Sequence, residues 1–355
     1  MMLKPPVTQS WLRILQIIFF TSAILYFGRD LLVPVLYGLF IAIVLYPLCK
    51  KLEMHHWPKS LAIAAGMLIV IAGFLLIGYL FIYQLSLLRK DIPAISLKVQ
   101  PAIAQLQHWA HYNTGLSMKT QEMWWQKIQE NISGNIGFIA QLTLTTVANS
   151  IVTLFLVPVY AVLFLYERNS FIHFLARIAG DNFKNNLHYI LHEVLHTYSN
   201  FIRGMVMVYF IVGCLNTVGL LALGIPHALL FGMLTAIMTI IPYIGIFISA
   251  LIPITVAWLT KDSIWYPVGV IAVFAIVQYL EANVIFPRVV GTKLKISTWA
   301  MLVGIISGGL LWGVSGMILF IPLLGIFKIL LDYIPEWRPA KFLLDREEAV
   351  TFQKR

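Results

Sequence analysis

Long apolar segments, each near or above the length of a bilayer-crossing helix, constrain this chain more than any other feature. Only 11% of its residues are charged, whereas soluble domains carry about 25%. A spanning helix needs about 20 apolar residues. The sequence therefore predicts an all-α polytopic membrane protein with about eight transmembrane segments. We place these segments at residues 11–27, 31–48, 60–84, 141–166, 201–224, 227–260, 263–287 and 296–331.

Two of these segments, 227–260 and 296–331, are too long for a single crossing, and each contains one copy of the same short pattern. The copies read Ile241-Pro242-Tyr243-Ile244-Gly245-Ile246-Phe247 and Ile321-Pro322-Leu323-Leu324-Gly325-Ile326-Phe327, with five of seven positions identical. Chance is an alternative, because Pro and Gly are common in membrane helices. Each segment is predicted to be a broken helix, either one kinked span or a hairpin.

The two copies predict helix breaks at Pro242 with Gly245 and at Pro322 with Gly325. Proline lacks the N–H that a helix interior needs, and glycine lets neighbouring backbones approach closely. A broken helix in lipid is tolerated only where its freed backbone groups face protein or water. Paired breaks indicate a transporter's binding site, so we predict that these four residues belong to gating segments.

The seventh segment contains the polar residues Gln278, Glu281 and Asn283, followed by Pro287 and Arg288. A carboxylate inside a span costs several kcal/mol unless it is paired, hydrated or protonated, and therefore indicates function. Pro287 removes the hydrogen bond that the Asn283 carbonyl would accept. We predict that this set couples transport to a cation or a proton. The alternative is a structural ion pair between Glu281 and Arg288 or a following lysine.

The sequence His192-Glu193-Val194-Leu195-His196 matches a zinc-protease pattern. A catalytic zinc also needs a third protein ligand and a site that holds substrate. The surrounding 167–200 loop is too short for a protease fold, so we predict no metal and no enzyme activity here. A pH-sensing role for the histidines is an open alternative. Because the chain has no phosphate-binding loop or nucleotide fingerprint, we predict no cofactor.

Lysine and arginine positions predict the orientation of the chain in the membrane. Basic residues cluster before the first segment, after the second and in the C-terminal tail, which places both termini in the cytoplasm. The net charge of +10 fits this rule and does not indicate nucleic acid. We divide the chain into N-terminal spans (1–85), an extracytoplasmic amphipathic helical segment (86–140), a C-terminal core with a cytoplasmic 167–200 loop (141–335) and a cytoplasmic tail (336–355).

Several short motifs occur in an order that resembles the autoinducer-2 exporter family of bacterial membrane permeases. They are Phe201-Ile202-Arg203-Gly204, Leu223-Gly224-Ile225-Pro226, Ile241-Pro242-Tyr243-Ile244-Gly245 and Glu281-Ala282-Asn283-Val284-Ile285-Phe286-Pro287-Arg288. The resemblance is concentrated in residues 201–331 and departs from the family pattern at Ala282 and Phe247.

The resemblance implies a bacterial inner-membrane secondary transporter that forms a homo-oligomer, with a pentamer as the arrangement it suggests. It adds Arg203 to the predicted site. The expected partners are the lipid bilayer, further copies of the chain, and a small-molecule or cation substrate. The predicted function is export of a small solute such as the autoinducer-2 signal, or exchange of monovalent cations for protons. A non-coupled channel and a membrane scaffold or regulator without transport are alternatives.

Overall fold

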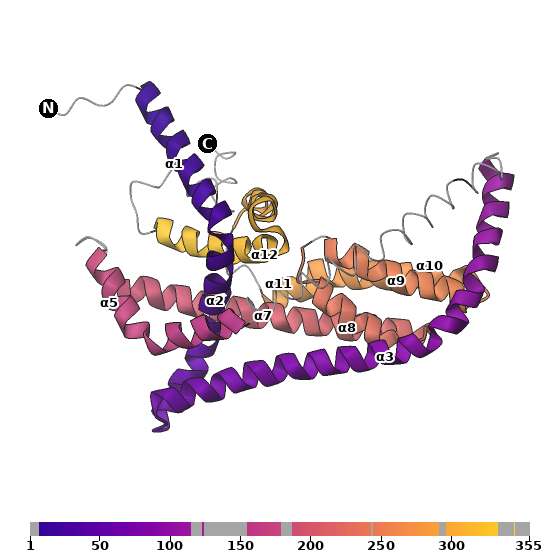
Figure 1. Ribbon diagram of the computed structural model, residues 1–355, viewed down its shortest axis with the longest axis horizontal. Coiled ribbons are helices and arrows are strands. Elements are labelled where there is room, and N and C mark those ends of the chain that lie inside the picture. Colours follow the sequence, from indigo (N-terminus) through magenta and orange to yellow (C-terminus); the bar gives the residue numbers. More distant parts are fainter. Residues whose placement is uncertain are drawn as a thin grey trace. The chain divides into compact units, whose positions relative to one another are not determined.

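The computed structural model describes residues 7–114, 123, 155–178, 187–242, 244–290, 296–332 and 344, and these are almost entirely helical. A break at Gly28 separates the first two helices. The helices, labelled in Figure 1, are α1 (Val7–Phe27), α2 (Arg29–Met54), α3 (Lys59–Thr114), α5 (Arg168–Ile178), α7 (Leu187–Ala222), α8 (Ala228–Met238), α9 (Ile244–Thr260), α10 (Trp265–Leu280), the π-helix η1 (Glu281–Ile285), α11 (Phe286–Val289) and α12 (Thr298–Asp332).

Five helical stretches of the described residues are long and apolar enough to cross a membrane. A bent pair, Phe155–Tyr166 with Arg168–Phe174, turns by 71° and would make a sixth span. Shorter apolar helices, among them α8 and α9, accompany these. The prediction of a polytopic all-α membrane protein is therefore confirmed. The five stretches are Arg29–Met54, Lys59–Leu88, Tyr189–Ala222, Trp265–Val289 and Thr298–Leu331.

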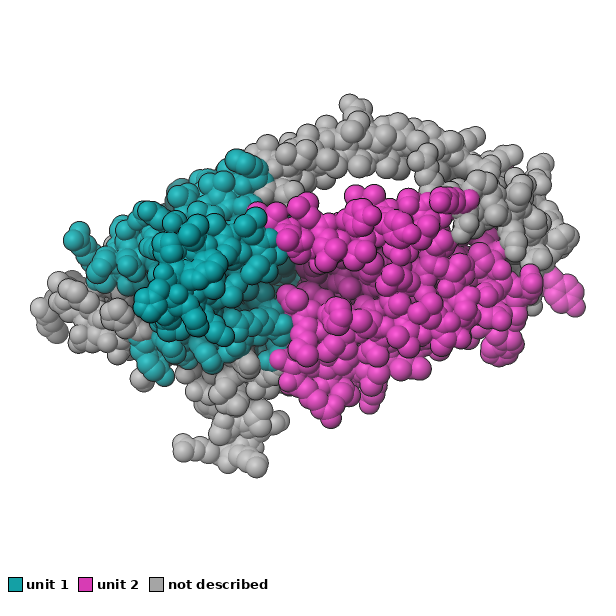
Figure 2. Space-filling model, turned by 90° about the horizontal axis from the view of Figure 1, so that it is seen from below, with its two compact units in different colours: residues 1–70, 153–205, 290–355 teal, residues 71–152, 206–289 magenta. Residues whose placement is uncertain are grey.

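The chain forms two compact units, coloured teal and magenta in Figure 2. Unit 1 contains Met1–Val70, Thr153–Met205 and Val290–Arg355, and unit 2 contains Ile71–Val152 and Val206–Val289. The helix α3 does not end near residue 85 but continues to Thr114. Most of the predicted extracytoplasmic segment beyond that point lies outside the described residues.

Unit 2 is built around the second half of α7 and the helices α8, α9 and α10, which follow one another along the chain (Figure 1). Their buried faces form one apolar cluster that includes Leu220, Phe231, Ala257 and Phe274. The end of α7 is fixed by its sequence. Gly224 has a φ of 63°, and the N–H groups of Gly224 and Ile225 donate to carbonyls of the last turn, which is the hydrogen-bond pattern of a glycine-terminated helix.

The segment 227–260 is a helical hairpin, in which α8 and α9 pack against each other and the chain turns at Pro242. At the turn, the N–H of Ile241 donates to the Met238 carbonyl at 2.9 Å. A Cβ added to Gly245 would lie 1.7 Å from the same carbonyl oxygen, so only glycine allows this approach. The chain breaks at Pro242, as expected, and Gly245 lies at the start of α9. The Met238 carbonyl at this break accepts a hydrogen bond.

The segment 296–331 breaks at a different place from the one expected. Pro322 lies inside α12, and the non-helical residue is Gly313, with φ 60° and ψ −139°. The two arms of α12 fold back on each other at Gly313. The close approach of Gly316 to Gly308 shows this, since a Cβ on Gly316 would lie 1.8 Å from the Gly308 carbonyl oxygen. The prediction of a break at Pro322 and Gly325 is therefore wrong. A proline is tolerated within a membrane helix where neighbouring groups satisfy the freed backbone atoms.

Polar contacts in unit 1 hold both arms of α12. The indole N–H of Trp312, next to the bend, donates to the Leu25 carbonyl of α1 at 2.8 Å. The backbone N–H of Ile326, four residues after Pro322, donates to the Tyr198 hydroxyl at 2.9 Å. The Tyr198 ring stacks on Phe40 of α2. The bend at Gly313 is thus fixed by residues remote in sequence, which explains why the local pattern placed it wrongly.

Gly313→Ala is expected to lower the free energy of unfolding by about 1–3 kcal/mol, because only glycine adopts this backbone conformation without strain. No atom lies within 4 Å of the added Cβ, so the cost is torsional and not steric. Gly78→Ala in α3 is the matched control, since its Cβ is equally free and its backbone is helical. Thermal unfolding of the purified protein measures both, and an equal effect of the two substitutions would contradict the prediction.

Candidate functional site

The candidate site is centred on Glu281, at the point where α10 changes into the π-helix η1. Pro287 lies in the turn that follows, in α11, and has no N–H to continue an α-helical ladder. The N–H of Phe286 accordingly donates to the carbonyl of Glu281 itself, five residues earlier. Single π-turns of this kind are frequent at functional sites. The sequence pattern predicted the disturbance at Pro287, although not its π-helical form.

Glu281 is half-buried, and no described residue forms an ion pair with its carboxylate. One of its oxygens, Oε2, is buried and has no hydrogen-bond partner among the described residues. Glu281 interacts electrostatically with Tyr209, on α7. The ion pair with Arg288 considered from the sequence is not found in the described part of the chain, where Arg288 is exposed. The lysines that follow Arg288 lie outside the described residues.

The other polar residues predicted on this segment point away from the protein interior. Gln278 and Asn283 are both exposed. The amide nitrogen of Asn283 donates to the carbonyl of Tyr279 at 2.9 Å, within its own helix. Glu281 is therefore the member of the predicted set whose side chain reaches into the protein.

The packing of α7 against α8 shows where Tyr209 lies. A Cβ on Gly213 would touch Ala236, and a Cβ on Gly232 would touch Thr217, so the two helices run antiparallel. Tyr209 precedes Gly213 by one turn, which places it level with the end of α8 and the turn at Pro242.

A Cβ on Gly219 would touch Val273, and a Cβ on Gly269 would touch Leu223, so α10 runs antiparallel to α7. This register places Glu281 level with the end of α8 and the α8–α9 turn. Glu281, Pro242 and Gly245 all belong to unit 2. The predicted coupling acid and the first of the two predicted breaks thus lie at the same level of this unit.

The remaining predicted residues belong to unit 1. Arg203 is exposed on α7, whereas Pro322 and Gly325 are buried in α12. These residues do not belong to unit 2, which contains Glu281, Pro242 and Gly245.

Three polar residues escaped the sequence analysis, namely Tyr209, Asn216 and Lys328. Asn216 is fully buried on α7; its amide nitrogen donates to the Val212 carbonyl at 2.9 Å, and its Oδ1 atom has no partner among the described residues. Lys328 is only 5% exposed within α12. Each lies in a predominantly apolar stretch of sequence, and intramembrane polar residues of this kind are functional candidates by default.

The zinc-protease pattern lies on the first turns of α7. His192 and His196 are exposed, and their rings stack with centroids 6.3 Å apart. Asn200 contacts the ring of His196 one turn later. Within the described residues, no group of three or more metal-ligating side chains comes together.

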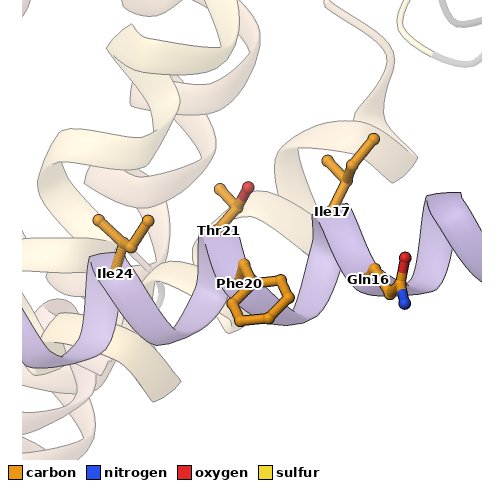
Figure 3. Close-up of a pocket in the computed structure, with 5 residues that line it drawn as sticks. All are labelled: Gln16, Ile17, Phe20, Thr21 and Ile24. Carbon is orange, nitrogen blue, oxygen red and sulfur yellow. The ribbon is translucent and has the colours of Figure 1, made fainter.

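A shallow open hollow lies on α1, outside the candidate site (Figure 3). All five residues that line it belong to this one helix, and three of them are apolar. Its lining, Gln16, Ile17, Phe20, Thr21 and Ile24, includes none of the predicted site residues.

Comparison with known proteins identifies related transporters. The sequence model of the AI-2E family transporters matches residues 15–336. The chain is 26% identical over 311 residues to the putative transport protein YueF of Bacillus subtilis, covering 85% of this chain and 84% of the relative. It is 26% identical over 341 residues to the AI-2 transport protein TqsA of Escherichia coli, covering 93% of this chain and 95% of that protein.

Gly245→Ala is expected to destabilise the α8–α9 hairpin by roughly 1–3 kcal/mol, the usual cost of overpacking. The added methyl group would overlap the Met238 carbonyl oxygen, and a backbone atom cannot move away alone. Gly73→Ala in α3, where the new Cβ meets no atom within 4 Å, is the matched control. Thermal unfolding measures the difference, and a Gly245→Ala protein as stable as this control would show that the hairpin is not closed as described.

Proposed function

The chain belongs to the AI-2E family of transporters, and from this premise we propose that it is a secondary transporter of the bacterial inner membrane. In this proposal, Glu281 exchanges a proton for the transported species, which is a monovalent cation or a small solute. The observation that carries the proposal is the Oε2 atom of Glu281, which lies within a span and has no hydrogen-bond partner in the described part of the chain.

An unpartnered carboxylate oxygen in a span has two favourable states. Either the carboxyl group is protonated, or its charge is compensated by a bound species, because an isolated charge in this environment costs several kcal/mol. Only the proton or the bound species can occupy the carboxylate at a time. Such competition is the physical basis of exchange, since binding of one species releases the other.

The α8–α9 hairpin is the proposed gate at Glu281. α8 has 11 residues and is therefore only about 16 Å long, roughly half of the hydrocarbon thickness. Its turn at Pro242 lies level with Glu281 by the register of α7, so a small movement of the hairpin would open or close access to the carboxylate. Transport requires that the bound species stabilise one position of the gate more than the other.

The membrane arrangement follows from the charge distribution. Arg288 and the lysines after it place the Glu281 end of α10 towards the cytoplasm, together with both termini. Copies of the chain would assemble into a homo-oligomer through their exposed apolar helices. The relative named as an AI-2 transport protein makes a small organic solute one of the two substrate classes to be tested.

In proteoliposomes, addition of a transported cation is expected to drive proton movement, which Glu281→Gln should reduce at least ten-fold. The substitution removes the exchangeable charge and preserves the size of the side chain. Purified protein should be tested with sodium, lithium and potassium in turn, and then with a small hydroxylated solute. Glu167→Gln, which makes the same chemical change at an exposed position, is the matched control and should retain full flux.

Full coupled flux in Glu281→Gln would contradict the coupling role. Flux that ignores an opposing proton gradient in the unmodified protein would instead identify a non-coupled channel.

Tyr209→Phe is expected to lower coupled flux about three- to ten-fold, the size of effect expected when one polar group is lost from a site. The substitution removes only the hydroxyl that interacts electrostatically with Glu281 and leaves the ring in place. Tyr279→Phe is the matched control, because Tyr279 is 66% exposed on α10 and should not affect transport. The same proteoliposome assay measures both variants, and equal flux in the two would exclude Tyr209 from the site.

A further inference from the structure

Two buried acceptor atoms of unit 2 have no hydrogen-bond partner among the described residues. They are Oδ1 of Asn216 and Oε2 of Glu281. Asn216 is 0% exposed, and its amide nitrogen is already used by the Val212 carbonyl. A buried amide oxygen without a donor costs about 1–3 kcal/mol. Buried acceptors of this kind are usually satisfied by an ordered water.

The two oxygens lie on the same seam between α7 and α10. A Cβ on Gly219 would touch Val273, and a Cβ on Gly269 would touch Leu223; these two contacts make the helices antiparallel. On α7, Asn216 precedes Gly219 by three residues and Leu223 by seven, so all three share one face. Asn216 therefore lies one turn before these contacts, on the face of α7 that packs against α10.

The spacing along this seam fits one bridging molecule. The two contacts place Asn216 level with Ile276, five residues or about 7.5 Å before Glu281 along the α10 axis. Helical side chains lean towards the N-terminus of their own helix. Because α7 and α10 are antiparallel, Asn216 and Glu281 lean towards each other. A single water bridges two acceptor oxygens that lie about 5–6 Å apart, the length of two hydrogen bonds.

We propose that one water molecule donates its two hydrogens to Asn216 Oδ1 and Glu281 Oε2 and forms an internal position for proton exchange. A water satisfies both acceptors at once. The side chains packed on this seam, Val212 and Val277, are buried and apolar, so they offer no further ligand for a bare cation.

The proton balance of this position is simple. When Oε2 is protonated, it donates to the oxygen of this water, whose own hydrogens bond Asn216 Oδ1 and a second water. When Oε2 transfers its proton to the bridging water, that water passes its other hydrogen to the second water as a proton and turns to donate to the ionised Oε2. Towards the water, Asn216 only accepts a hydrogen bond, and it is never protonated. Its role is to hold the water in line with Glu281. This role in proton exchange rests on the proposed function, whereas the water position does not.

Infrared spectroscopy of the purified full-length protein tests the position without any transport. The carboxyl stretch of protonated Glu281 is the band that Glu281→Gln removes. In Asn216→Leu, the water loses its anchor, so this band is expected to move to higher frequency, and its small shift in ¹⁸O-labelled water is expected to disappear. Asn216→Ser keeps an acceptor oxygen and should retain the original band.

Thr217→Val is the matched control, because the Thr217 hydroxyl donates to the Gly213 carbonyl within α7 and should not affect the band. Should Asn216→Leu fail to fold, Asn216→Ala removes the same acceptor and leaves space. An unchanged Glu281 band in both apolar variants would overturn the proposal.

Proton flux in proteoliposomes then tests the role of the water. A band shift accompanied by an approximately ten-fold loss of flux supports the exchange position. A band shift with full flux would make the water purely structural and overturn its role. A band shift in a protein that moves no proton with any cation or solute would refute the proposed function and leave the water position intact.

Discussion

The structure depends on one constraint, that a polar group inside an apolar segment must find its partner within the protein. The α8–α9 turn shows how the chain meets it. The Met238 carbonyl at the end of α8 accepts a hydrogen bond from Ile241, and Gly245 brings the start of α9 directly against the same carbonyl. Glu281 and Asn216 are exceptions, since each has an oxygen without a partner in the described part of the chain.

The difference between hydrogen-bonded backbone groups and side-chain oxygens without a partner distinguishes the structural part of unit 2 from its candidate site. The Met238 carbonyl at the turn has its hydrogen bond and therefore supports the hairpin, whereas the two side-chain oxygens without a partner among the described residues are available for a mobile partner. In a transporter, a site must bind its species in one state and release it in another, so incomplete satisfaction in the resting protein is consistent with function. The π-helical turn after Glu281 adds a local irregularity at the same place.

The fold class and the hairpin at Pro242 could be predicted from the sequence because both have local causes. Apolar length predicts membrane spans, and the missing N–H of proline predicts a helix break. The bend in α12 could not be predicted in this way. The sequence around Pro322 is nearly identical to that around Pro242, but the bend lies at Gly313. The neighbouring Trp312 donates a hydrogen bond from its indole N–H to α1. Tertiary contacts therefore determine whether α12 bends at Gly313 or at Pro322.

The candidate site was predictable in part for a similar reason. A carboxylate in a span is energetically costly and is visible in the sequence alone, so Glu281 could be predicted. Tyr209 and Asn216 become relevant only when the antiparallel register of α7 and α10 is known, because they are separated from Glu281 by more than 60 residues in sequence. Gln278 and Asn283 were selected as polar residues of the same segment, but the sequence did not reveal that both side chains are exposed.

The central claim is that binding of the transported species displaces a proton from Glu281. Its most direct test is the number of protons released when the purified protein binds its cation or solute, measured by titration calorimetry in buffers of different ionisation enthalpy. The account predicts that binding releases a proton from the unmodified protein and none from Glu281→Gln. Binding without proton release, or equal release from both proteins, would contradict it.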